Sequence, residues 1–181
     1  MNRYYLVAIL LFSWSYSARA DNWPQWRGPE RNGHVSSGTW PSSLKEPHLV
    51  QSWRVEMPPS YSGPVVSADR VFVTYSRGKE HEGVRALDRQ TGKEVWKSEW
   101  KGAMTVAGLG TSMGSWIRAT PALDGKRLYV FFGKSGVFCF DLDGKELWQT
   151  SVGDRTSGWG SGSSPLLYKN LLIVKIGRAH V

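Results

Sequence analysis

An internal repeat constrains the fold of this 181-residue chain more than any other feature of its sequence. Two segments share one order of blocks: a strand opened by a proline, a β-rich strand, a strand ending in Asp, and a Gly-Lys-Glu-apolar-Trp strand. The first copy runs from Ser62 to Trp96 and the second from Ala119 to Trp148. A third copy opens at Ser163 and continues to Val174. The two tryptophans are 52 residues apart, near the roughly 40–50 residues of a repeat made of one four-stranded sheet.

Each copy is predicted to form four short antiparallel strands. Apolar residues alternate along residues 71–75 and 128–132, as a half-buried strand requires. Asp-Gly pairs at 124–125 and 143–144 predict tight hairpin turns. One such sheet cannot bury both faces, so neighbouring sheets must stack on it. We therefore predict an all-β chain: a partial β-propeller of four-stranded antiparallel blades, about two and a half blades of a parent with roughly seven or eight.

The last two strands of the repeat carry a specific motif. Residues 86–96 read Ala-Leu-Asp-Arg-Gln-Thr-Gly-Lys-Glu-Val-Trp, and residues 140–148 are a similar version that is shorter by one turn residue. This pattern resembles the repeat of the PQQ-like (quinoprotein-type) propellers, and residues 23–29 resemble the start of large exported bacterial members. The resemblance covers most of residues 22–174. It implies that the repeat tryptophan packs against the adjacent blade, which makes Trp53, Trp96 and Trp148 inter-blade docking residues.

The first twenty residues are predicted to be a signal peptide. Arg3 is followed by an apolar run at 4–14 and by Ala18-Arg19-Ala20, which predicts cleavage before Asp21. An uncleaved anchor is the alternative, but the run is shorter than the roughly 20 residues that span a bilayer. Asp rather than Cys follows the cleavage site, which argues against a lipoprotein. We expect a periplasmic or secreted protein.

The remaining chain divides around the repeats. We expect an N-terminal segment at 21–61 with a ring-closing outer strand near 49–55, a first blade plus rim insert at 62–117, a second blade plus rim insert at 118–161, and the start of a third blade at 162–175. Residues 176–181 read Ile-Gly-Arg-Ala-His-Val, which matches the translation of a sequencing adapter. We interpret this tail as an artefact; a genuine polar tail is the alternative.

The charge pattern and the cysteine content argue against a nucleic-acid-binding protein and against a disulfide-stabilised fold. The formal net charge is +8, but the basic residues are scattered singly and form no run of five, which argues against nucleic-acid binding. Cys139 is the only cysteine, so an intrachain disulfide is impossible and packing must hold the fold. Its apolar neighbours predict a buried strand residue rather than a reactive thiol.

Three patterns that suggest chemistry lack the context that the chemistry needs. Gly110–Gly114 matches Gly-x-Ser-x-Gly, but it lies in an insert between β repeats and not between a strand and a helix. Asp141–Gly144 resembles the start of a calcium loop, but Val152 stands where the bidentate Glu is needed. The histidines at 34, 48 and 81 show no zinc-ligand spacing. We assign no catalytic residue and no metal ligand.

The resemblance implies two functions. The first is a non-catalytic exported scaffold, similar to the propeller lipoprotein of outer-membrane β-barrel assembly, that binds protein partners or an envelope ligand through its rim. Trp116 and Trp159 lie in the rim inserts and are candidate contacts. The alternative is a PQQ-dependent alcohol or sugar dehydrogenase, with PQQ and calcium near the propeller axis and site residues mostly in other blades. Many such enzymes have an adjacent cysteine pair at the cofactor, which this sequence lacks.

Overall fold

The computed structural model describes residues 22–35, 38, 40–78, 80–102, 114–153 and 162–176. The predicted signal peptide, Trp159, most of the Gly110–Gly114 motif and the last five residues lie outside these ranges. Within them the chain is all-β, with one 3-10 turn, η1 (Gly133–Ser135), and no α-helix. No helix in the described ranges has the length and apolar character needed to cross a bilayer.

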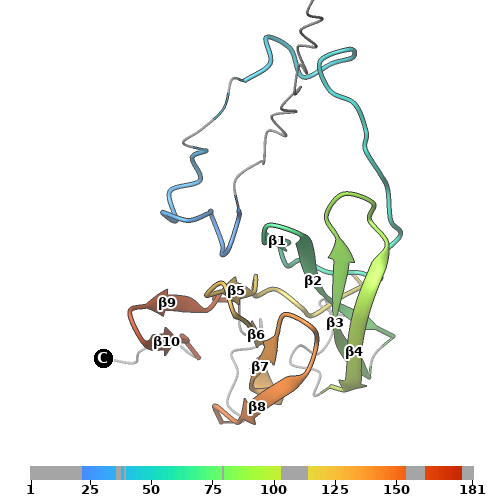
Figure 1. Cartoon of the computed structure of the whole chain (residues 1–181). Coiled ribbons are helices and arrows are strands. Elements are labelled where there is room, and N and C mark those ends of the chain that lie inside the picture. Colours follow the sequence, from blue (N-terminus) through green and yellow to red (C-terminus); the bar gives the residue numbers. More distant parts are fainter. Residues whose placement is uncertain are drawn as a thin grey trace, which may run out of the picture.

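Two sheets have four antiparallel strands each, in sequential order, and a third has two (Figure 1). The first sheet consists of β1 (Val65–Val66), β2 (Arg70–Arg77), β3 (His81–Asp88) and β4 (Glu94–Lys101). The second consists of β5 (Ala122–Leu123), β6 (Arg127–Phe131), β7 (Val137–Asp141) and β8 (Glu146–Thr150), and the third of β9 (Leu166–Tyr168) and β10 (Leu171–Ile173). The predicted fold class, a partial propeller of four-stranded antiparallel blades, is confirmed.

The two complete sheets share a bulge at the same point of the repeat. In the first sheet Ala86 pairs with Trp96 and Leu87 pairs with Glu94, so one residue of β4 is extra. In the second sheet Cys139 pairs with Trp148 and the next pair skips one residue of β8 in the same way. A bulge bends and twists a strand locally. The equal bulges place the two tryptophans at equivalent positions of their sheets.

The main core lies between the two complete sheets. Phe72 and Val84 of the first sheet and Leu128 and Phe138 of the second belong to one buried cluster, and none exposes more than 2% of its surface. Trp100 of β4 stacks on Phe138, with ring centroids 4.3 Å apart. Burying aromatic side chains of this size is the largest favourable contribution that such a seam has.

The third repeat covers the other face of the second sheet. Leu172 of β10 and Val174 pack against buried Phe131 and Val137. The outer face of the third repeat stays exposed at positions such as Ile173. Successive repeats therefore lie face to face, as the sequence predicted from the inability of one sheet to bury both its faces.

Cys139 lies on β7 and is fully buried and unpaired, which confirms the prediction of a buried strand residue. Burial raises the pKa of its thiol to about 11. Because the thiolate is the reactive form, this cysteine is inert at neutral pH.

Residues 49–55, expected to form an outer strand, have no strand in the structure. The expected partner of this segment is the last blade of the ring, and a strand needs a partner for its backbone hydrogen bonds. Trp53 within it nevertheless contacts the first sheet, as described below.

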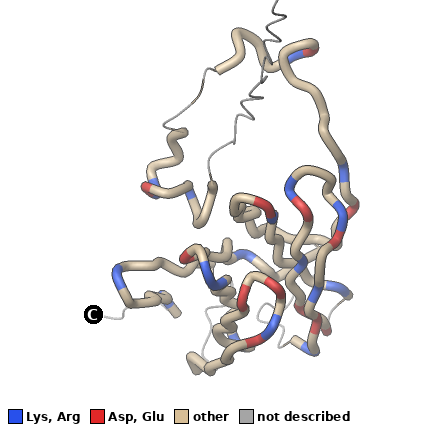
Figure 2. Tube along the Cα trace, in the orientation of Figure 1, with Lys and Arg blue, Asp and Glu red and all other residues tan. Residues whose placement is uncertain are grey.

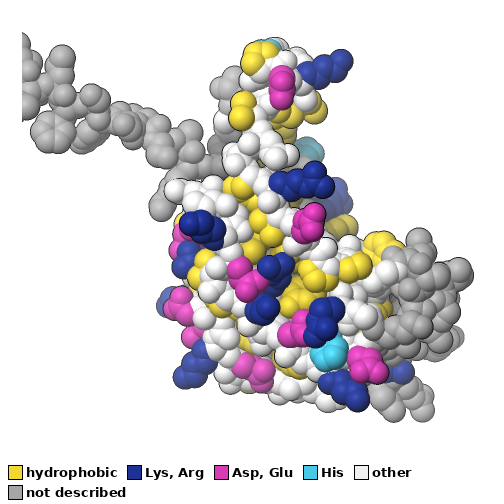
Figure 3. Space-filling view, turned by 90° about the vertical axis from the view of Figure 1, so that its right-hand side faces the viewer, with side chains coloured by type: hydrophobic (Ala, Val, Ile, Leu, Met, Phe, Trp, Pro, Cys, Tyr) yellow, Lys and Arg dark blue, Asp and Glu magenta, His cyan; other side chains and the backbone are white. Residues whose placement is uncertain are grey.

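Basic and acidic residues are interspersed along the described chain (Figure 2). Arg85 pairs with Glu94 at 2.6 Å across β3 and β4, and Arg77 pairs with Glu99. Figure 3 shows basic and acidic side chains mixed on the right-hand side of the molecule. On this face the described residues form no single-signed patch of the kind that binds a nucleic-acid backbone.

Candidate functional site

Trp96 crosses from the first sheet to the second. Its indole Nε1 donates a 2.9 Å hydrogen bond to the carbonyl oxygen of Leu142, in the turn between β7 and β8. In the same turn Gly144 has φ +92°, and a Cβ at this glycine would lie 2.6 Å from Cδ2 of Trp96. The glycine is required twice over, because the backbone is left-handed and the indole occupies the side-chain space.

Trp53 makes the same contact one repeat earlier. Its Nε1 donates a 3.0 Å hydrogen bond to the carbonyl oxygen of Arg89, in the turn between β3 and β4. A Cβ at Gly92, where φ is +71°, would lie 2.7 Å from Cδ2 of Trp53. A tryptophan of one repeat thus packs on the glycine turn of the next at two successive positions.

The other tryptophans singled out from the sequence have different environments. Trp148 is 40% exposed, with its ring 6.1 Å from that of Tyr129. The third repeat is described only through its first two strands, so the turn equivalent to those at Gly92 and Gly144 is outside the described residues, and docking of Trp148 stays a prediction. Trp116, a candidate rim contact, is instead 4% exposed in the core, and Trp159 lies outside the described residues.

Trp116 is buried because its indole has a partner inside the seam. Its Nε1 donates a 2.8 Å hydrogen bond to Oε1 of Glu82, a fully buried carboxyl on β3. Desolvation raises the pKa of Glu82 to about 7, although the hydrogen bond from Trp116 opposes the rise. A carboxyl that titrates near neutrality inside a seam between blades was not found by sequence reasoning.

The N-terminal segment crosses the first strands of all three repeats. Trp23 pairs with Val66 of β1 through two backbone hydrogen bonds of 2.9 Å, and the carbonyl oxygen of Pro24 accepts one of 2.8 Å from Leu123 of β5. The Arg31 guanidinium lies 3.5 Å from the carbonyl oxygen of Pro165, directly before β9. The first strands of successive blades surround the central channel of a propeller, so this segment lies at the axis.

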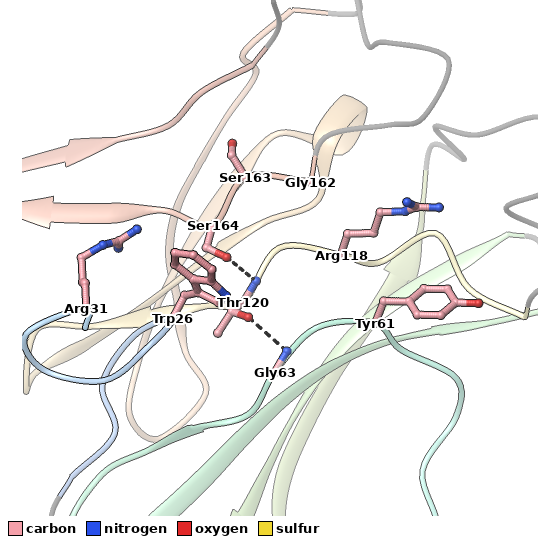
Figure 4. A pocket seen from close by; sticks show the side chains of 9 residues that line it. All are labelled: Trp26, Arg31, Tyr61, Gly63, Arg118, Thr120, Gly162, Ser163 and Ser164. Carbon is pink, nitrogen blue, oxygen red and sulfur yellow. Dashed lines mark hydrogen bonds between the residues drawn. The ribbon is translucent and has the colours of Figure 1, made fainter. Parts of the chain in front are cut away.

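A pocket of about 460 Å³ opens where these first strands begin, and we call it the axial pocket (Figure 4). Trp26 and Arg31 come from the described residues 22–35, and the other lining residues come from equivalent positions directly before β1, β5 and β9. Its lining consists of Trp26, Arg31, Tyr61, Gly63, Arg118, Thr120, Gly162, Ser163 and Ser164.

Each repeat opens with a strand that a proline precedes, and hydrogen bonds link the residues directly before these three prolines. The Gly63 amide donates to Oγ1 of Thr120 at 3.0 Å, and the Thr120 amide donates to Oγ of Ser164 at 3.0 Å (Figure 4). Each blade thereby donates one N–H to a hydroxyl of the next blade. Both hydroxyl oxygens act as acceptors here, so each hydroxyl still has its own proton to donate.

Two arginines flank this hydroxyl pair, each beside an aromatic ring (Figure 4). The guanidinium carbon of Arg31 lies 5.7 Å from the Trp26 ring centroid, and that of Arg118 lies 5.7 Å from the Tyr61 ring centroid. The buried Nε of Arg118 has no hydrogen-bond partner in the described part of the chain. No acidic side chain belongs to the lining. The pocket is therefore rich in donors and positive charge, which suits an anion.

A family model described as "Outer membrane protein assembly factor BamB" matches residues 80–180, more than half of the chain. The chain belongs to this PQQ-like repeat β-propeller family. The matched region holds both docking turns, at Gly92 and Gly144, and the pre-proline residues Thr120 and Ser164. The family pattern and the observed seams therefore coincide.

Curated relatives in this propeller family differ in function. The chain is 31% identical over 112 residues to an outer membrane protein assembly factor BamB of Burkholderia pseudomallei (strain K96243), covering 62% of this chain and 24% of that protein. It is 27% identical over 160 residues to a polyvinylalcohol dehydrogenase of a Pseudomonas species, and the alignment covers 86% of this chain and 23% of that protein. The chain thus spans about a quarter of the length of each.

A solved structure supports the fold. The chain superposes on the crystal structure of quinohemoprotein alcohol dehydrogenase from Comamonas testosteroni with a TM-score of 0.57 and 20% identity, covering 88% of this chain and 24% of that one. At this identity the likeness concerns the propeller architecture alone.

The axial pocket fits part of what the quinoprotein members of the family imply. PQQ carries carboxylates, and the arginines and hydroxyls of the pocket are suitable donors for them. Calcium needs several oxygen ligands, among them carboxylates. No cluster of three or more His, Cys, Asp or Glu side chains that could hold a metal occurs in the described residues.

Sequence reasoning did not find the axial pocket, although one signal for it was present. Thr120 and Ser164 stand at the same place in their repeats, directly before the proline, and both carry a hydroxyl. The convergence of these positions with Trp26 and Arg31 could not be read from the sequence, because it depends on where the N-terminal segment crosses the blades.

Proposed function

We propose that this chain belongs to an exported propeller that acts as a non-catalytic binding module of the cell envelope. The chemistry of the axial pocket carries this proposal. Its lining offers guanidinium and hydroxyl donors beside two aromatic rings, but no carboxylate or imidazole. A site that abstracts a proton from a substrate needs such a base within hydrogen-bonding reach. The lining favours retention of a ligand over its chemical conversion.

The partner is proposed to be a protein or an envelope ligand met at the rim of the propeller. The relative described as an outer membrane protein assembly factor supports a role in protein assembly. Export through a cleaved signal peptide, without a lipid anchor, is part of the proposal and rests on the pattern at residues 3–21. The mixed charge on the face shown in Figure 3 gives no reason to propose nucleic acid as a partner.

Deletion of the gene tests the scaffold role. We expect the deletion strain to contain less folded outer-membrane protein, and the full-length gene on a plasmid to restore the amount. A gene with Trp96→Ala should fail to restore it, whereas Trp40→Ala, which changes an exposed tryptophan, should succeed. An unchanged content of outer-membrane proteins in the deletion strain would count against the scaffold role.

A PQQ-dependent alcohol or sugar dehydrogenase is the second candidate. The donor-rich axial pocket favours it, since the pocket suits carboxylates, and so does the alignment with a polyvinylalcohol dehydrogenase over 86% of the chain. Arg31 and Arg118 would hold carboxylates of PQQ, and calcium ligands would come from blades outside this chain. PQQ, when bound, would accept the electrons released by alcohol oxidation.

One assay separates the two candidates. The full-length protein is supplied with PQQ and calcium, and dye-linked alcohol oxidation is measured. Clear turnover would make the non-catalytic proposal wrong. An adjacent cysteine pair and a cluster of Glu, Asn and Asp near the axis in the remainder of the protein would support the dehydrogenase.

A further inference from the structure

The first sheet has a face that points away from the second sheet, which we call the outer face. Val84 and Ala86 of β3 belong to the core between the two complete sheets. Successive side chains of a strand point to opposite faces, so Arg85 between them points outward. A hollow of about 330 Å³ on the outer face is lined by Pro58, Tyr75, Arg77, Arg85, Lys97 and Glu99.

The repeat places Arg85 at the position that Phe138 has in the second sheet. Arg85 pairs with Val73 of β2, as Phe138 pairs with Val130 of β6. In the seam between the two complete sheets Phe138 is only 2% exposed, and its ring stacks on Trp100 of the preceding repeat. Arg85 therefore occupies the equivalent place in the seam ahead of the first sheet.

Met57 occupies the place of Trp100 in that seam. Trp53 and Trp96 make equivalent contacts with the glycine turns of the next repeat. Met57 follows Trp53 by four residues, as Trp100 follows Trp96. The geometry agrees, because Nη1 of Arg85 donates to Sδ of Met57 at 3.1 Å. The stacked pair of rings in one seam thus corresponds to an arginine beside a thioether in the other.

Ion pairs lie beside this contact where the next seam has aromatic rings. Nε of Arg85 lies 2.6 Å from Oε2 of Glu94, and the two side chains are 20% and 32% exposed. Arg77 pairs with Glu99, whose Oε2 also accepts a 3.3 Å hydrogen bond from Tyr75. Partly exposed ion pairs contribute little to stability and are screened by salt, whereas stacked aromatic rings are not screened.

We propose that the last repeat of the same protein closes the ring on the outer face of the first sheet, through an ionic seam that opens more readily as salt rises. Trp53 docks on the first sheet as the tryptophan of a preceding repeat does, so the other strands of that repeat belong over the outer face. The chain spans about a quarter of the length of its curated relatives, which leaves sequence for those strands. This inference concerns ring closure and goes beyond the function proposed above.

Photo-cross-linking of the full-length protein identifies what covers the outer face. The photoreactive residue p-benzoylphenylalanine replaces Lys97, which lines the hollow, and the cross-linked peptides are identified by mass spectrometry. We expect position 97 to be joined to the last repeat of the same chain. The same replacement at Lys145, an exposed residue in the turn between β7 and β8, is the control and should not reach that repeat. A cross-link from position 97 to a second copy or to another protein, or none to the last repeat, would make the proposed occupant wrong.

Oxidation of Met57 by dilute hydrogen peroxide measures how readily the seam opens, because a thioether is oxidised where the reagent reaches it. Sulfoxide formation at Met57 is followed by mass spectrometry in the full-length protein. Between about 0.1 M and about 1 M KCl the screening length falls from about 10 Å to about 3 Å, and we expect the rate to rise about twofold or more. Arg85→Phe introduces the residue that the second sheet has. It should slow the oxidation about threefold or more and remove the salt dependence, since methionine packs well on an aromatic ring.

Arg54→Gln is the matched control, since it removes a positive charge from the same segment at an exposed position outside the hollow. Met57 should be oxidised in this variant as in the unaltered protein at both salt concentrations. Thermal denaturation checks that each variant is folded, and the salt series on the unaltered protein needs no variant. A rate at Met57 that does not change with salt, or equal rates in folded Arg85→Phe and the unaltered protein, would overturn the ionic seam. The scaffold role fails separately, on the deletion strain or on PQQ-dependent turnover.

Discussion

The indole of Trp96 donates a 2.9 Å hydrogen bond to the carbonyl oxygen of Leu142, one residue beyond the Asp that ends β7. Trp53 donates its equivalent bond to Arg89, one residue beyond the Asp that ends β3. The first two seams between repeats therefore use one contact, in which an indole packs on a glycine of the next turn. In a repeat protein the interfaces between neighbours provide much of the stability. Single substitutions at this contact should therefore affect the whole fold.

Replacement of Trp96 measures the strength of one seam. Trp96→Ala removes the hydrogen bond and the aromatic contacts with Phe72 and Phe140, whose ring centroids are each 6.0 Å away. We expect the free energy of unfolding to fall by about 3 kcal/mol, and by about 1 kcal/mol for Trp96→Phe, which loses mainly the hydrogen bond. Urea denaturation of the full-length protein provides the measurement, with Trp40→Ala as the exposed control. Equal midpoints for Trp96→Ala and Trp40→Ala would contradict a docking role.

Substitutions at two glycines with the same backbone conformation distinguish the cost of backbone strain from the cost of displacing the docked indole. Gly144 and Gly125 have φ of +92° and +89°, but only at Gly144 would a Cβ meet another group, the indole of Trp96. Gly125→Ala should cost about 1 kcal/mol for the left-handed backbone. Gly144→Ala should cost about 1–3 kcal/mol more, because the indole is displaced. Denaturation midpoints of the two variants check the difference, and equal losses would mean that the seam tolerates a methyl group.

The repeat made most of the architecture predictable. Alternation at residues 71–75, the Asp-Gly turns and the Gly-Lys-Glu-apolar-Trp strand are local patterns, and each maps to a strand or turn that the structure contains. The packing of Trp96 on the next repeat followed from the family resemblance. Its acceptor, the Leu142 carbonyl, has no sequence signature because any residue provides a backbone oxygen.

The features that sequence reasoning missed depend on non-local packing. Trp116 was expected at the rim because it lies in a Gly-rich insert, but its indole is buried in the core and donates to Glu82. The axial pocket joins residues from four separate segments of the chain. No periodic pattern reports how the N-terminal segment crosses the blades, since its contacts with Val66 and Leu123 are made by backbone atoms.

The hydrogen bond between Gly63 and Thr120 is predicted to stabilise the inner edge of the seam between the two complete sheets. Thr120→Val keeps the shape of the side chain but removes the acceptor for the Gly63 amide. An N–H without a partner costs about 1–3 kcal/mol when it is fully buried. Because the Gly63 N–H is only part-buried, we expect a loss toward the lower end of that range in urea denaturation, larger than the loss for Thr120→Ser. Thr120→Ser retains the hydroxyl and should stay within about 1 kcal/mol of the unaltered protein. Equal losses for Val and Ser would attribute the effect to packing of the methyl group instead.

Glu82 is predicted to make stability depend on pH between about 4.5 and 7. Burial raises the pKa of this carboxyl in the folded protein to about 7, whereas its ordinary value is 4.5. Below pH 4.5 the carboxyl is protonated in both the folded and the unfolded chain, so it adds no pH dependence there. Between the two values the unfolded chain ionises first and the folded chain binds more protons. The free energy of unfolding therefore falls as the pH rises, by a total on the order of 3 kcal/mol.

Glu82→Gln should remove this dependence while keeping an oxygen that can accept the hydrogen bond from Trp116. The denaturation midpoints of Glu82→Gln and of the unaltered protein are measured at several pH values from 4 to 8. The difference between the two midpoints is then compared across pH, because the contribution of every other carboxyl cancels in it. We expect the difference to change in favour of the Gln variant as the pH rises to 7 and to level off above it. Glu146→Gln, which neutralises an exposed carboxyl on β8, serves as the control. A constant difference between Glu82→Gln and the unaltered protein across the whole range would show that Glu82 is ionised in the folded seam, with its charge stabilised by the indole N–H of Trp116.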